Sequence, residues 1–73
     1  MEGRGGVTVL MNESKRQITV HIEPWGEEHA LGPGEKLRVT GESPQGNELE
    51  ISWGEDRVTV YGNSGGTVKV EPV

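Results

Sequence analysis

Apolar and polar residues alternate along most of the chain. Val7, Val9 and Met11 form the first apolar set, and Leu10 falls on the opposite face of the same segment. Because side chains of a strand point alternately to its two faces, each such set predicts a β-strand with its apolar face in the core. Six strands are predicted in this way, around Val7–Met11, Ile18–Ile22, Leu37–Val39, Leu49–Trp53, Val58–Val60 and Val68–Val70.

No segment has the apolar spacing of an amphipathic helix, and twelve glycines disfavour a long one. The expected fold is therefore all-β: a six-stranded, mainly antiparallel β-sandwich or flattened barrel, immunoglobulin-like or cupredoxin-like in appearance. A small SH3-like or OB-like barrel is the alternative. Residues 1–5 are expected to form a disordered N-terminal tail, and residues 6–73 a single β domain.

Composition and charge narrow the function. The chain of 73 residues has no cysteine, which excludes disulfides, thiolate metal sites and a cysteine nucleophile. Its net charge of -5, with the basic residues scattered, argues against nucleic acid and anionic membranes as partners. No apolar run is long enough to span a bilayer. A cytoplasmic protein is the expectation.

The segment from Glu23 to Glu35 combines an indole, an imidazole and several carboxylates. Pro24 cannot donate to a strand ladder, so we expect the second strand to end there and the next to start after Gly34. Trp25 has two interpretations: it caps an open end of the core, or it anchors a protein interface. Leu31 is expected in the core beside it, and Trp53, in phase with its strand, is expected to be buried. The candidate partner-binding residues are Trp25, Glu27, Glu28 and His29.

A metal site is the alternative for this segment. His21 and Glu23 are two residues apart on one predicted strand, so their side chains share a face. His29, in the following loop, would complete a three-ligand site for zinc or copper(II). The competing interpretation is a solvated strand face paired with basic residues. Otherwise no cofactor is expected.

Nothing in the sequence favours an enzyme. The serines carry no nucleophile motif, and the glycine-rich stretch at residues 62–66 lacks the lysine and following helix of a phosphate loop. Glu48 and Glu50 share a strand face, but a glycosidase pair needs a cleft that so small a domain rarely provides.

Residues 12–39 resemble a group of small uncharacterised bacterial all-β proteins. The shared features are a strand ending in Glu-Pro-Trp-Gly, an acidic stretch, and Leu-x-Pro-Gly-Glu before the next strand. The resemblance implies the β fold and brings no activity with it. The sequence therefore predicts a non-catalytic binding module whose partner is another protein or a second copy of the chain, with divalent-metal binding by His21, Glu23 and His29 as the alternative.

Overall fold

The structure is a computed structural model that describes residues 6–44, 49–63 and 65–73. The predicted tail of residues 1–5 lies outside these ranges. The described residues form seven β-strands and no helix, so none of them forms a helix long and apolar enough to cross a membrane. The strands are β1 (Gly6–Met11), β2 (Ile18–Glu23), β3 (Glu27–Leu31), β4 (Lys36–Glu42), β5 (Glu50–Trp53), β6 (Arg57–Tyr61) and β7 (Thr67–Pro72).

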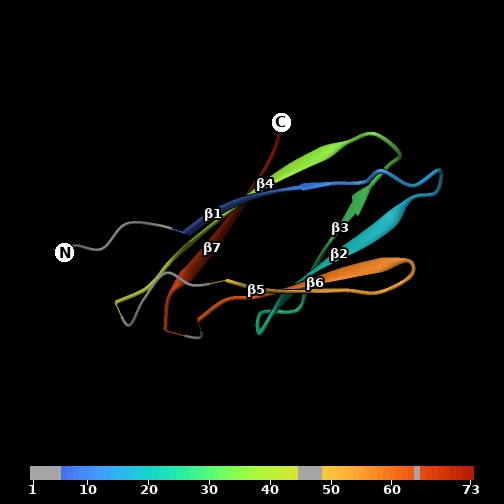
Figure 1. Ribbon diagram of the computed structural model, residues 1–73. Helices are drawn as coiled ribbons and strands as arrows, with labels where there is room; N and C mark the ends of the chain where they lie inside the picture. Colours follow the sequence, from blue (N-terminus) through green and yellow to red (C-terminus); the bar gives the residue numbers. More distant parts are fainter. Residues whose placement is uncertain (1–5, 45–48, 64) are drawn as a thin grey trace.

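The strands form two sheets that lie in two layers (Figure 1). One sheet has the order β1-β4-β7 and is antiparallel throughout. The other has the order β3-β2-β6-β5, with β2 and β6 parallel and the outer pairs antiparallel. Both sheets have free edges, so the predicted β-sandwich is confirmed and the closed-barrel alternative does not hold.

Strand β3 was not predicted, because the sequence places residues 27–31 in a connection between strands. Apart from its buried last residue, Leu31, this strand is polar or small, and it lies at the edge of its sheet. A tight turn joins it to β2: the Gly26 N–H donates to the Ile22 carbonyl at 2.9 Å. Gly26 has a φ of 79°, a conformation that glycine adopts without the steric cost of a side chain. Strands β2 and β3 therefore form a hairpin, whereas the sequence predicted that the strand after Pro24 would start only after Gly34.

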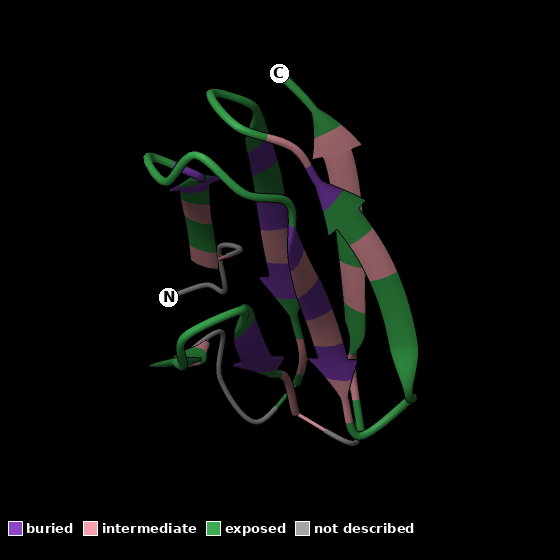
Figure 2. Ribbon diagram, turned by 90° about the vertical axis from the view of Figure 1, so that its right-hand side faces the viewer, coloured by how far each residue is buried: buried purple, intermediate pink, exposed green. Residues whose placement is uncertain are grey.

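The core lies between the two layers, where buried positions alternate with half-buried ones along β2 and with mostly exposed ones along β4 (Figure 2). The parallel pairing of β2 with β6 sets Val20 beside Val58 and Ile22 beside Val60, all fully buried. The buried apolar residues are Leu10, Ile18, Val20, Ile22, Leu31, Leu37, Val39, Val58 and Val60.

The predicted phase of β1 is wrong. Val7, Val9 and Met11 are 59%, 48% and 40% exposed, whereas Leu10 is 3% exposed. Alternation shows that the two sets lie on opposite faces, but it does not show which face is inside. Asn12, in phase with Leu10, is itself buried, and its hydrogen bonds hold that face of the strand inward.

Trp53 is also not a core residue, because 57% of it is exposed. It pairs with the buried Val58, so its phase points toward the core as predicted. Strand β5, however, is at the edge of its sheet, and an edge residue has no neighbouring strand to cover its outer side.

Asn12 links two of the connections that pass between the sheets. Its side-chain amide donates to the carbonyls of Arg16 at 2.7 Å and Leu31 at 2.9 Å, and its side-chain oxygen accepts the Ser14 N–H at 2.9 Å. Its backbone N–H donates to the Glu35 carbonyl at 3.0 Å. The β1–β2 loop and the β3–β4 turn, which carry the chain from one sheet to the other, are thereby held together through one side chain.

We predict that Asn12→Ala lowers the free energy of unfolding by about 2–4 kcal/mol, because the Leu31 carbonyl in a buried bond and the Arg16 carbonyl in a partly buried one lose their donor. Urea unfolding followed by circular dichroism measures this loss. Asn63→Ala is the control: the side chain of Asn63 accepts an exposed local bond from the Gly65 N–H at 3.0 Å, so its removal should cost about 1 kcal/mol or less. Equal losses in the two variants would contradict the role given to Asn12.

Candidate binding cleft and the Trp25 corner

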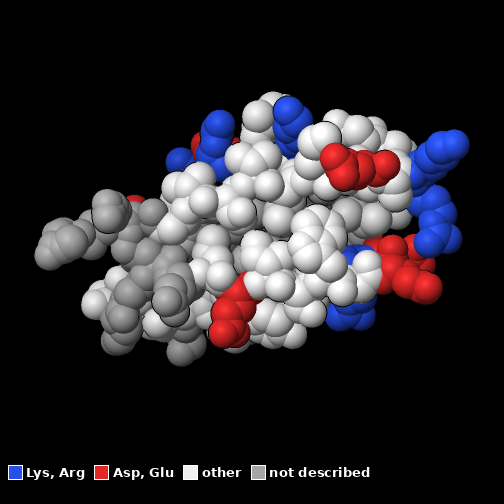
Figure 3. All heavy atoms as spheres, viewed as in Figure 1, with Lys and Arg blue, Asp and Glu red and all other residues white. Residues whose placement is uncertain are grey.

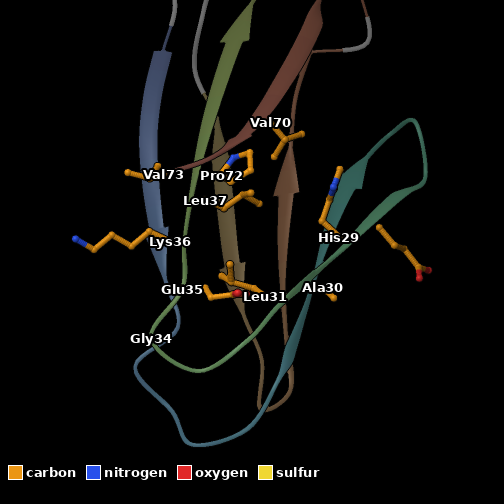
Figure 4. A pocket seen from close by; sticks show the side chains of 11 residues that line it. His29, Ala30, Leu31, Gly34, Glu35, Lys36, Leu37, Val70, Pro72 and Val73 are labelled. Atoms are coloured by element: carbon orange, nitrogen blue, oxygen red, sulfur yellow. The ribbon is translucent and has the colours of Figure 1, made fainter.

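A cleft of about 840 Å³ opens between the sheets on the side where the β3 and β7 edges lie (Figure 4). We call it the β3–β7 cleft. It exists because the sandwich is unclosed: an edge strand of each sheet borders the gap, with no strand joining them. Its lining is Glu28, His29, Ala30, Leu31, Gly34, Glu35, Lys36, Leu37, Val70, Pro72 and Val73.

The apolar part of the cleft continues the core outward. Leu31 and Leu37 are 2% and 7% exposed, and the partly buried Val70 packs against the same cluster. The turn from β3 to β4 closes one end: the Gly32 N–H donates to the Glu35 carboxylate at 2.6 Å, and the Glu35 N–H donates to the Gly32 carbonyl at 3.1 Å. A partner side chain in the cleft would therefore meet hydrocarbon from both sheets.

His29 gives the cleft a polar wall. It pairs with Val20 across the β2–β3 ladder, so its side chain shares the core-facing side of the sheet with that valine. Its Nε2 lies 3.4 Å from the Glu27 Oε1, on the same edge strand. The His29 side chain remains 35% exposed, so it borders both the core and the solvent.

His21 and Glu28 lie on the outer face of the same sheet. They are cross-strand partners, and the His21 Nδ1 is 3.7 Å from the Glu28 Oε2. This contact becomes an ion pair only when the imidazole is protonated. The Glu28 side chain is 66% exposed and also borders the cleft, which leaves its carboxylate open to a cation from outside.

The structure does not bring the three candidate metal ligands together. His21 and Glu23 share the outer face of β2, whereas His29 lies on the core-facing side of β3. In the described ranges, no group of three histidine or acidic side chains is placed to hold a metal ion. The metal hypothesis stays a prediction that a titration decides.

Trp25 lies in the β2–β3 turn. Its position agrees in part with both interpretations that the sequence left open, a cap on the core and an exposed anchor. It is 40% exposed, yet its ring covers Gly62: a Cβ on Gly62 would lie 2.8 Å from the Trp25 Cζ3. The same Cβ would be 2.6 Å from the Val68 Cγ2, so the indole sits over the end of the sandwich. The other side of the ring is available to solvent.

Two of the four candidate partner-binding residues, Glu28 and His29, line the cleft, whereas Glu27 and Trp25 are not among its described lining residues. Sequence reasoning missed the apolar part of the cleft, because Leu37 and Val70 look like ordinary core positions. A signal was present in Pro72, which suits a strand at a sheet edge.

Comparisons of the chain with protein-family models, with curated proteins and with solved structures return no match. The functional argument therefore depends on the geometry of the described residues.

We predict that Trp25 and Gly62 are energetically coupled. Gly62→Ala should destabilise the protein because the new methyl group displaces the indole, and part of this cost should disappear when Trp25→Ala is already present. A double-mutant cycle in urea should give a coupling of about 0.5–2 kcal/mol. In the control cycle, Gly62→Ala and Trp53→Ala should be additive within about 0.5 kcal/mol; additivity in both cycles would refute the contact.

If His21, Glu23 and His29 together hold a metal, calorimetric titration with Zn²⁺ should show binding that His21→Ala and His29→Ala each abolish, because a three-ligand site loses its geometry with either imidazole. Glu50→Gln, which removes one exposed carboxylate elsewhere, should leave the heat unchanged. Binding that survives either histidine substitution, or no heat in the wild type, would end the three-ligand hypothesis.

Proposed function

We propose that this protein is a non-catalytic binding module that recognises another polypeptide through the β3–β7 cleft. The observation that carries the proposal is the cleft itself, in which an apolar interior from both sheets opens to solvent beside His29 and Glu28. Apolar pockets with a few polar groups at their border are the usual form of a recognition site.

The charges around the cleft favour a cationic partner segment. Two exposed carboxylates, Glu27 and Glu28, stand on β3, and the whole chain carries a net charge of -5. Lys36 lies on the β4 side of the opening. A large apolar side chain next to an arginine or lysine would fill the interior and place its cation against β3.

An extended polypeptide fits this position better than a compact ligand. The cleft is bordered by two edge strands, β3 and β7, with no strand joining them, so an extended segment can lie along this open flank without pairing with the protected edges. Among the described lining residues, the side chains are apolar, imidazole, carboxylate or ammonium groups, and none is a hydroxyl or thiol nucleophile. This composition supports binding over acyl transfer by a serine or cysteine nucleophile.

Selection of random peptides displayed on phage, followed by titration of the enriched synthetic peptides, tests the proposal. We expect the enriched peptides to share a large apolar residue next to arginine or lysine. Glu28→Lys should raise their Kd at least about fivefold, because it replaces the favourable carboxylate with a repelling cation.

Glu50→Lys is the matched control. It makes the same charge change at an exposed position of another edge strand, β5, away from the cleft. The Kd should change less than about twofold in this variant, since a distant exposed charge is screened. An absence of enriched peptides, or an equal response of the peptides to both substitutions, would overturn the proposal.

A further inference from the structure

Among the edge strands that the structure describes, β1 is the one whose sequence lacks protection against pairing with another strand. Exposed edges are commonly protected by charged residues or proline. The other three edge strands have such residues: β3 has Glu27 and Glu28, β5 has Glu50, and β7 has Lys69, Glu71 and Pro72. The sequence of β1, Gly-Val-Thr-Val-Leu-Met, has neither a charge nor a proline.

The exposed face of β1 is apolar as well as uncharged. Val7, Val9 and Met11 are three of the large hydrophobic residues that the protein exposes. Trp53, also exposed, borders a 330 Å³ pocket with Met11 on the side of the sandwich where β1 and β5 lie. Figure 3, viewed toward this side, shows a broad uncharged area in the middle of the molecule.

The backbone of the same three residues is directed to the open edge. The Asn12 N–H donates to the Glu35 carbonyl, continuing the antiparallel register of β1 with β4. Because the N–H and C=O groups of successive residues in a strand point to opposite sides, Leu10 and Thr8 also face β4. Val7, Val9 and Met11 therefore have their N–H and C=O groups on the free side.

We propose that a second copy of this chain pairs with β1 in antiparallel orientation, about a two-fold axis that passes beside Val9. In this register Val9 faces Val9 of the second copy, and Val7 faces Met11 of the second copy. On the core-facing side, Thr8 faces Leu10 of the second copy. The two three-stranded sheets then form one continuous sheet, β7-β4-β1 followed by β1-β4-β7 of the second copy.

The self-complementary sequence favours a second copy over another occupant. In this register every cross-chain pair on the exposed face is apolar with apolar, and the free backbone groups of both strands meet. On this face Lys36 and Arg38 lie one strand back on β4, opposite Met11 and Val9. The net charge of -5 on each copy opposes association, so added salt should tighten the dimer. This surface is on the opposite side from the β3–β7 cleft, and the inference does not depend on the function proposed there.

Sedimentation at several protein concentrations tests the association. The wild type should form a dimer, and Val9→Lys should raise its dissociation constant at least about tenfold, because two lysines would meet at the axis. Tyr61→Lys is the matched control: Tyr61 is 46% exposed, close to the 48% of Val9, but lies on the other sheet. A monomeric wild type, or equal weakening by both substitutions, would overturn the inference, whereas the peptide experiment on the cleft would be unaffected.

Single cysteines test the register, because the natural sequence has none. Under mild oxidation Val9→Cys should give a covalent dimer, since the facing Cα atoms of such a pair are about 5.5 Å apart, within disulfide range. Val7→Cys alone should not cross-link, but an equal mixture of Val7→Cys and Met11→Cys should. Cross-linking of Val7→Cys with itself, or of none of these, would refute the proposed register.

Discussion

The fold depends on the hydrogen bonds of one buried amide. Among the described residues the two sheets share no backbone ladder, so the connections that pass between them must be held by other contacts. For two of these connections, the β1–β2 loop and the β3–β4 turn, Asn12 provides such contacts: it donates to the Arg16 and Leu31 carbonyls while its backbone bonds to the β3–β4 turn. An apolar residue of similar size would leave these carbonyls without their donors, and burial makes that loss costly. The same bonds also set the phase of β1, since Asn12 and Leu10 must both face inward.

The phase of β1 determines which part of the protein surface is apolar. With Leu10 turned into the core, Val7, Val9 and Met11 are exposed. The cleft on the opposite side has a related origin, because a sandwich of two open sheets has an unclosed gap on each flank. Both candidate recognition surfaces therefore arise from how the two open sheets pack against each other, and neither needs an added loop or insertion.

Much of the architecture could be predicted from the sequence, because period-two alternation leaves little choice but β-strands with one buried face. The strands around Val20, Val39 and Val58 were identified in this way. Burial depends on position in the sheet, which alternation does not contain: Trp53 has the right phase but lies at an edge. Strand β3 was missed because its few apolar residues make it resemble a polar connection.

The candidate site was predicted only in part. Glu28 and His29 attracted attention through their chemical type, and they do border the cleft. Leu37 and Val70 have no such signal, since their role depends on which strands end up as edges. The separation of His21 from His29 likewise follows from a hairpin whose register the sequence does not display. The local sequence pattern predicts the individual strands. Which strands pair, and which of them lie at sheet edges, depends on packing between segments far apart in the sequence.

The parallel pairing of β2 with β6 has a consequence for how the chain reaches this structure. Thr19 lies beside Arg57, so the central contact of the larger sheet joins segments separated by about half of the chain. Closing such a long loop costs entropy before any packing offsets it, and folds dominated by distant contacts form slowly. During synthesis β2 can meet β3 early, but its other edge stays open until β6 has left the ribosome. The nascent protein thus presents an apolar strand whose second edge stays uncovered until β6 is available.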